Sequence, residues 1–319
     1  MDWFGAGGNG PLIVIRAIHF AATAVTTGTL VFRTAVARPA FRSAPRHFER
    51  VRAQTRHLTW SALVITVASG VIWLLLETAA MSGLPFNEAM APSVLSTALN
   101  ETQFGLVSEI RLGLVIVLAV CLAYDRFPPA DWLAVAAATG LTAAVAWTGH
   151  GGSTSGELGK LHLAADALHL IAAASWIGGL IPLVLLLAQA RKHPTVEWAS
   201  IAGDAAERFS ILGVVSVATL MATGFVNAWI LVGSFDALFV TEYGRLLMLK
   251  IIVFAVLLVL AAINRFWLTP RLAAPPENGA RIQALRQLTR NSIVEIAFGL
   301  AIFAIVGMLG TLHPAIHMM

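Results

Sequence analysis

Long apolar runs separated by short polar segments are the dominant pattern of this chain. Eight runs are each about 20 residues long, the length that an α-helix needs to cross the hydrocarbon core of a bilayer. The predicted spans are Pro11–Phe32, Leu58–Thr78, Phe104–Tyr124, Trp132–Thr148, Leu158–Leu187, Phe209–Val232, Tyr243–Phe266 and Ser292–Leu312. The pattern predicts an all-α, polytopic membrane protein, in which no polar stretch is long enough to form a soluble domain.

Composition agrees with a location in the lipid bilayer. Of the 319 residues, 58% are hydrophobic and only 12% are charged, which is well outside the range of soluble proteins. The single cysteine, Cys121, excludes an intrachain disulfide and a thiolate cluster. The chemistry of the chain must therefore come from the few polar side chains that interrupt the apolar spans.

Lysine and arginine mark one side of the predicted bundle. They gather in the loops after the first, fifth and seventh spans, whereas residues 79–103 and 149–158 contain none. Because basic loops face the cytoplasm, we expect both termini on the outer, periplasmic side. The same rule, together with anionic lipid headgroups, explains the arginine cluster at 33–56, so we expect no nucleic-acid partner.

The two halves of the chain resemble each other. Residues 104–127 align without a gap to residues 243–266, and RAIHFAATAVTTGTL in the first span matches DALHLIAAASWIGGL in the fifth. The pairs include Gly105 with Gly244, Arg111 with Lys250, His19 with His169, and Gly28 with Gly178. We therefore predict two parallel four-helix repeats, residues 1–150 and 151–319, related by an axis along the membrane normal.

Three polar residues share one face of the fifth span. His162, Asp166 and His169 stand at i, i+4 and i+7, and ionisable groups inside a membrane often mark a ligand site or a pathway. If the first and fifth spans meet at the axis, His19 converges with Asp166 and His169. Imidazole and carboxylate groups bind transition metals. The alternative is that each histidine is satisfied by a neighbouring helix.

A second group of candidate ligands lies at the predicted outer rim. Gly149-His150 ends the fourth span, and Gly310 and His313 end the eighth, so the repeat relates the two histidines. His317, Met318 and Met319 follow, and imidazole and thioether groups suit copper. We expect His150 and His313 to bind metal, whereas the last three residues fit a frayed tail equally well.

The remaining polar residues inside the spans suit structural roles. Glu109 can pair with Arg111 or Lys250, and Glu295 is expected in the first turn of the last span, where it favours the helix dipole. Pro182 should kink the fifth span and form a constriction below the polar face. The chain has no Walker A, HExxH or GxSxG motif in a plausible context, so we expect no enzyme and no use of ATP.

Several strings resemble one known family. They are GHGG at 149–152, ADALHLIAAASWIGGL at 165–180, RFS at 208–210, TGFVNAW at 223–229, YGRLLMLK at 243–250 and INR at 263–265. Together they resemble the copper resistance D (CopD) proteins of the bacterial inner membrane. The resemblance implies copper handling beside, or fused to, a periplasmic CopC-type copper-binding protein. No such domain is fused here, so we expect a separate copper donor.

The residues by themselves fit either a metal ion or a haem as the ligand. Histidines that face each other across four-helix units also hold b-type haem in membrane cytochromes, which makes an electron carrier the alternative function. Asp166, one turn from His169, would crowd a porphyrin and favours a metal ion. A third possibility is a polar core that only supports the bundle and serves a periplasmic partner.

Overall fold

The computed structural model describes residues 10–124, 127–149, 152, 156–272 and 279–317, and it forms helices and turns without a strand in those residues. Eight helical segments are long and apolar enough to cross a membrane, which confirms the predicted all-α, polytopic class. The long helices are α1 (Gly10–Val31), α3 (Pro45–Ser82), α6 (Gln103–Ala123), α7 (Pro128–Ala143), α9 (Gly156–Ala173), α10 (Gly179–Lys192), α11 (Val196–Val232), α13 (Glu242–Ile263) and α15 (Gly279–Leu309).

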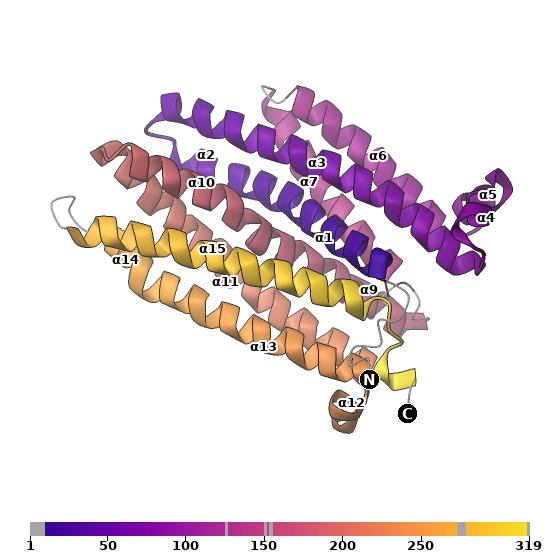
Figure 1. Cartoon of the computed structure of the whole chain (residues 1–319). Coiled ribbons are helices and arrows are strands. Elements are labelled where there is room, and N and C mark those ends of the chain that lie inside the picture. The colour runs from indigo at the N-terminus through magenta and orange to yellow at the C-terminus, as the bar shows by residue number, and fades with distance from the viewer. Residues whose placement is uncertain (1–9, 125–126, 150–151, 153–155, 273–278, 318–319) are drawn as a thin grey trace.

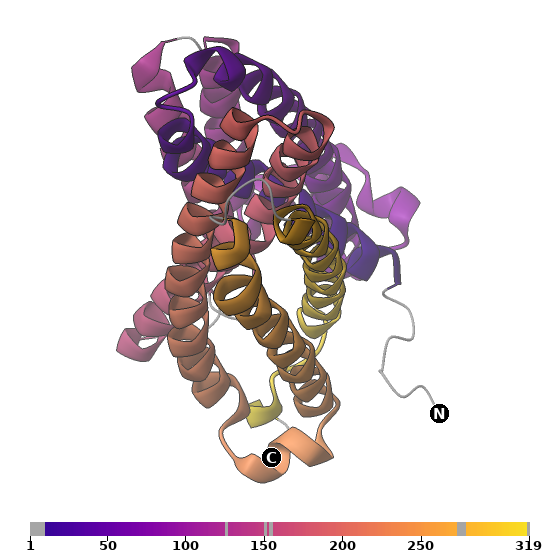
Figure 2. The same cartoon turned by 90° about the vertical axis from the view of Figure 1, so that its left-hand side faces the viewer.

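Short segments extend or connect these helices. Three are π-helical, namely η1 (Phe32–Ala37), η3 (Ala174–Gly178) and η4 (Asn264–Leu268), and two are 3₁₀-helical, η2 (Ala144–Thr148) and η5 (Ala315–His317). The short α-helices are α2 (Arg38–Ala40), α4 (Phe86–Ala89), α5 (Pro92–Asn100), α12 (Phe235–Val240) and α14 (Thr269–Leu272). The long helices run side by side, and the start of α1 lies at the same end of the bundle as η5 (Figure 1). We call this the terminal end. We call the opposite end, where α2 and α14 lie, the arginine-rich end; it faces the viewer in Figure 2.

Three helices begin well before the apolar runs that predicted them. α3 starts at Pro45, α11 at Val196 and α15 at Gly279, in segments rich in charged residues. A hydropathy pattern marks only the part of a helix that contacts lipid. The helix itself can continue into a polar segment if one of its faces packs against other helices. In this case α15 begins 16 residues before Glu295, so the expected place of Glu295 in a first helical turn is wrong.

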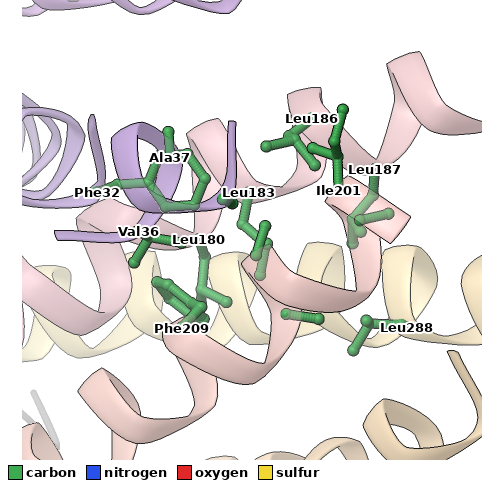
Figure 3. Packing of buried hydrophobic residues seen from close by; sticks show 14 of the residues in the cluster. Phe32, Val36, Ala37, Leu180, Leu183, Leu186, Leu187, Ile201, Phe209 and Leu288 are labelled. Carbon is green, nitrogen blue, oxygen red and sulfur yellow. The ribbon is translucent and has the colours of Figure 1, made fainter. Parts of the chain in front are cut away.

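The extended ends pack together at the arginine-rich end. Trp198 meets the ring of Phe41 edge-on at 5.9 Å. The largest buried cluster continues from there through η1, α10, α11 and α15, where Phe32, Leu180, Phe209 and Leu288 interdigitate (Figure 3). Apolar contacts therefore hold the two halves of the chain to each other at this end.

The first and fifth spans meet in close contact, which was the condition for the predicted convergence of their histidines. A Cβ atom placed on Gly178 would lie 1.9 Å from the carbonyl oxygen of Ala24, and one on Gly28 would lie 2.3 Å from that of Ala174. The two backbones are thus in direct contact, as small residues allow between membrane helices.

The irregularity expected near Pro182 takes the form of a π-helical segment. Pro182 has no N–H to give the carbonyl of Gly178, and η3 ends at that residue. A π-helical turn absorbs such a break in the i to i−4 ladder. It also widens the helix where the side chain of Trp176 is buried.

The contact between the two backbones can be tested with one methyl group. We expect Gly178→Ala to destabilise the protein by about 1–3 kcal/mol, because the methyl group meets backbone atoms that have little room to move. The measurement is thermal unfolding of the purified protein in detergent. Gly113→Ala on α6 is the matched control, since a Cβ there has no neighbour within 4 Å. Equal melting temperatures for the two variants would contradict the close crossing.

Candidate functional site

His19 lies in a closed pocket of the first half. Its Nδ1 is 3.0 Å from the hydroxyl oxygen of Ser69 on α3, and the guanidinium of Arg111 on α6 hydrogen-bonds to its Nε2. Arginine only donates, so Nε2 accepts and the ring proton resides on Nδ1, which donates to Ser69. Both ring nitrogens are therefore engaged, and the side chain is 1% exposed.

Trp73 fills the space beside His19. The indole is fully buried, and its centroid is 5.4 Å from that of the His19 ring. The guanidinium carbons of Arg16 and Arg111 lie 5.2 and 5.4 Å from the same indole, in cation–π geometry. The indole N–H donates to Glu77 at 2.9 Å. One aromatic side chain thus completes the core of this half and holds two buried cations.

His169 lies in a similar setting in the second half, but with open space beside it. Its Nδ1 is 3.0 Å from the hydroxyl oxygen of Thr223 on α11. One helical turn away, Asp166 accepts a hydrogen bond from the amide of Asn227 at 3.3 Å. Lys250 on α13 is close enough to Asp166 and His169 to interact with both electrostatically.

The two settings share one hydrogen bond and the position of the residue four places after it. Ser69 and Thr223 each contact the Nδ1 of a histidine. Trp73 lies four residues after Ser69 and contacts Arg16, whereas Asn227 lies four residues after Thr223 and contacts Asp166. The smaller Asn227 leaves unfilled the volume that an indole occupies in the other half.

A cavity of about 580 Å³ occupies this part of the second half, and we call it the His169 cavity. Its wall is largely apolar and comes from α9, η3, α11, α13 and α15 of the second half, together with residues of α1 and η2 of the first half. The polar side chains that line it are Arg16, Thr148, His162, Asp166, His169, Asn227, Tyr243 and Lys250. The structure thus brings three of the predicted site residues, His162, Asp166 and His169, to one cavity.

His19 is not part of this wall, so the expected convergence of His19 with His169 does not occur. The reason lies in the spacing of each histidine from the central crossing. His19 precedes Gly28 by nine residues, and His169 precedes Gly178 by nine. Nine residues are about 2.5 helical turns, so each histidine lies on the side of its helix opposite the crossing. The first and fifth spans meet, but their histidines point away from each other.

Of the predicted rim residues, His313 is the one whose side chain the structure describes. Thr148, Gly149 and Gly310 line the cavity, and His313 is exposed three residues after Gly310. His150 lies outside the described residues, as do Met318, Met319 and the side chain of His317. Glu109 is exposed on α6 and, in the described part of the chain, forms no ion pair with Arg111 or Lys250.

The site residues are not pre-assembled as a metal centre. Among the residues with described positions, no three histidine, cysteine, aspartate or glutamate side chains are close enough to share one ion. His162 and His169 are two turns apart on α9, about 10 Å along the helix axis. The cavity therefore offers separate imidazole and carboxylate groups along its wall.

Arg16, Trp73 and Tyr243 are site residues that sequence reasoning missed. The alignment of the first and fifth spans already contained one signal, because it places Arg16 opposite Asp166. The two halves therefore carry charges of opposite sign at positions that the alignment pairs. The partners of Trp73 depend on which helices flank α1, which a single sequence does not reveal.

The fold and the cavity define a class of protein: a multi-pass helical membrane protein with a largely apolar cavity into which a few ionisable side chains face. A family model described as "Copper resistance protein D-like, N-terminal domain" matches residues 8–160, and one described as "Copper resistance protein D" matches residues 203–309. The chain belongs to the copper resistance protein D family, and it is a multi-pass protein of the inner membrane.

Three relatives align with this chain over different fractions of the two sequences. Copper resistance protein D of Pseudomonas syringae pv. tomato is 29% identical over 263 residues, covering 81% of this chain and 84% of that protein. Inner membrane protein YebZ of Escherichia coli K12 is 29% identical over 305 residues, covering 95% and 98%. Copper transport protein CutJ of Bacillus subtilis 168 is 30% identical over 295 residues, covering 90% of this chain and 50% of CutJ. No solved structure matches the chain.

The role of Trp73 in the first half can be measured directly. We expect Trp73→Ala to destabilise the protein by about 3–5 kcal/mol, because it leaves a cavity and removes the aromatic face from two buried cations. Thermal unfolding in detergent reports the loss. Trp229→Ala on α11 is the control, since that indole is 72% exposed. A loss for Trp73→Ala no larger than the control would contradict the role given to the indole.

Proposed function

We propose that this protein accepts a copper ion in the His169 cavity and passes it inward across the membrane without ATP. The observation that carries the proposal is that His162, Asp166 and His169 line one cavity inside the membrane-spanning region. The family names of its relatives concern copper resistance and copper transport, and they supply the identity of the metal.

The contacts of His169 and Asp166 suit metal binding. Thr223 holds the Nδ1 side of the His169 ring, which leaves Nε2 as the nitrogen for a ligand. Asn227 holds one carboxylate oxygen of Asp166 and leaves the other. Asp166 compensates the charge of an incoming cation in a wall that is otherwise largely apolar.

Lys250 weakens the binding of a copper ion in this cavity, and weaker binding suits a transport route. Its ammonium group interacts with both Asp166 and His169, so a copper ion must compete with a charge already present. Binding along a transport route has to be strong enough for entry and weak enough for release. We therefore propose transient binding at separate groups rather than a resident copper centre.

Entry is proposed at the terminal end, which the distribution of arginines places on the periplasmic side. His150 and His313 follow Gly149 and Gly310, and both glycines line the cavity. In this proposal the rim histidines receive copper from a separate CopC-type periplasmic donor. Imidazole exchanges copper readily with other nitrogen and sulfur ligands.

The inward route passes Trp176, Met221 and Leu258. These three residues line both the His169 cavity and a second cavity nearer the arginine-rich end. They form the apolar partition between the two spaces, and Trp176 lies in η3, where the helix is widened. The membrane potential or cytoplasmic copper ligands would supply the driving force, because the chain has no ATP-binding motif.

The proposed ancestry from two copies, residues 1–150 and 151–319, is supported by matching helix starts. The hydroxyls of Thr102 and Thr241 each accept the N–H of a glycine three residues on, at 3.0 Å in both halves. Each of them also donates at 2.6 Å to a carbonyl four residues back. In this proposal one copy keeps its cavity open and the other has closed it with Trp73.

A b-type haem carrier has weaker support. An axial pair needs two imidazoles on opposite faces of a porphyrin. His162 and His169 come from the same helix, and His19 has both nitrogens engaged in a separate pocket. An absorption spectrum separates the two functions, because a Soret band in the purified protein would support haem.

The copper site predicts a specific pattern of metal loss. We expect His169→Ala and Asp166→Asn to weaken copper binding by about tenfold or more, because each removes a group that faces the cavity. Copper per protein after equilibration, determined by elemental analysis, is the measurement. His47→Ala is the control, since that ring lies at the surface beside Glu197. Unchanged copper content in both cavity variants would exclude the site.

Filling the cavity tests the same proposal without removing a ligand. We expect Asn227→Trp to lower copper uptake into proteoliposomes by about tenfold, because an indole at this position occupies the space that Trp73 fills in the first half. Leu168→Trp is the control, since Leu168 is exposed on α9. Normal uptake by the Asn227→Trp variant would show that copper takes another route.

A further inference from the structure

A second cavity of about 510 Å³, which we call the Glu295 cavity, lies between the partition and the arginine-rich end. Asn264 and Arg265 from η4 and Ser292 and Glu295 from α15 line it. Glu295 is only 1% exposed. The cavity therefore has a buried carboxyl group in its wall, and the proposed copper site does not use it.

Neutral groups surround the carboxyl of Glu295. It accepts a hydrogen bond from the side-chain amide of Asn264, whose own oxygen accepts one from Asn291 at 2.9 Å. Ser292, one turn away, has a buried hydroxyl with no hydrogen-bond partner. Within the described part of the chain, no cation is at ion-pair distance from Glu295.

Arg265 is the one other charged residue that lines this cavity in the described ranges, and it is directed elsewhere. Its guanidinium donates to Ser210 on α11 at 2.8 Å and lies over the ring of Phe266. The remaining lining residues come from η3, α10, α11, α13, η4, α14 and α15, and they are uncharged; they include Trp176, Leu180 and Thr269. Among the described residues that line the cavity, none forms an ion pair with Glu295.

Asp131 shows how the fold pairs a buried carboxyl group with cations. This residue lies near the start of α7, in the first half, and is also buried. Arg33 donates to one of its oxygens at 2.7 Å, and Arg38 donates to the other. Two guanidinium groups thus compensate one carboxylate, whereas Glu295 has one amide donor.

We propose that Glu295 is a proton-binding site that faces the Glu295 cavity. An ionised carboxyl buried without a cation is costly, and taking up a proton removes that cost. A metal ion suits the place poorly, because Asn264 directs its N–H groups at the carboxyl and Arg265 already places a positive charge on the wall. The free hydroxyl of Ser292 is positioned to relay a proton or hold a water.

The link to transport rests on the proposed function. In that proposal copper passes the partition into the Glu295 cavity, so a proton leaves Glu295 as a cation passes. Proton binding at Glu295 itself does not depend on copper. It is therefore tested by measurements on the protein in the absence of metal ions.

The test uses dicyclohexylcarbodiimide, an apolar reagent for protonated carboxyl groups. The acid O–H adds across a C=N bond of the reagent, and an acyl shift to nitrogen leaves a stable adduct that keeps every atom of the reagent. We expect the Glu295 peptide of the full chain to be labelled at about pH 6. The label should fall about tenfold per pH unit once the carboxyl is ionised. Asp131 should remain unlabelled throughout.

Infrared difference spectra between acid and alkaline pH report the same proton without needing reagent access. The carboxylic C=O band should vanish in Glu295→Gln and persist in Glu109→Gln, whose side chain is exposed on α6. In Asn264→Leu, loss of the donor to the carboxylate should carry labelling to higher pH. Labelling that does not change with pH, or the absence of both label and band, would overturn the proposal, whatever the copper assays show.

Discussion

Direct backbone contact between α1 and η3 is the constraint on which the rest of the structure depends. Gly28 and Gly178 let the two central spans touch without a side chain between them. A helix has one face for such a contact, so polar groups on the opposite face must turn toward the outer helices. His19 therefore meets α3 and α6, and His169 meets α11 and lies near Lys250 of α13. One close crossing thus divides the buried imidazoles between two separate environments.

The two environments show how one side chain decides between a core and a cavity. Trp73 packs at a tilt against the ring of His19 and lies against the guanidinium groups of Arg16 and Arg111, so the first half is packed at this point. Asn227, in the corresponding place, reaches only Asp166. The volume that remains is lined by the polar stripe of α9 and by Lys250. The space around His19 is thus filled, whereas an open cavity lies beside His169.

Buried carboxyl groups follow an electrostatic rule in this fold. Asp131 lies between two guanidinium groups, which keep its charge compensated. Asp166 has an amide and the more distant ammonium of Lys250, so a cation that arrives there finds an incompletely compensated site. Glu295 has an amide alone. Compensation therefore decreases from a carboxyl group in a structural ion pair to the two carboxyl groups that face cavities.

The sequence by itself determined the eight spans and the shared face of His162, Asp166 and His169. Both follow from local properties, namely hydropathy and the 3.6-residue period. Pairing of His19 with His169 was suggested by alignment, but only tertiary structure decided that they diverge, because a side chain's partners depend on which helices lie beside its own. The early start of α15, and with it the depth of Glu295, was also decided by packing, because hydropathy marks contact with lipid and not the end of a helix. The exchange of Trp73 for Asn227 could be read in the sequence, yet its consequence is a volume, and a volume exists only once the surrounding helices are in place.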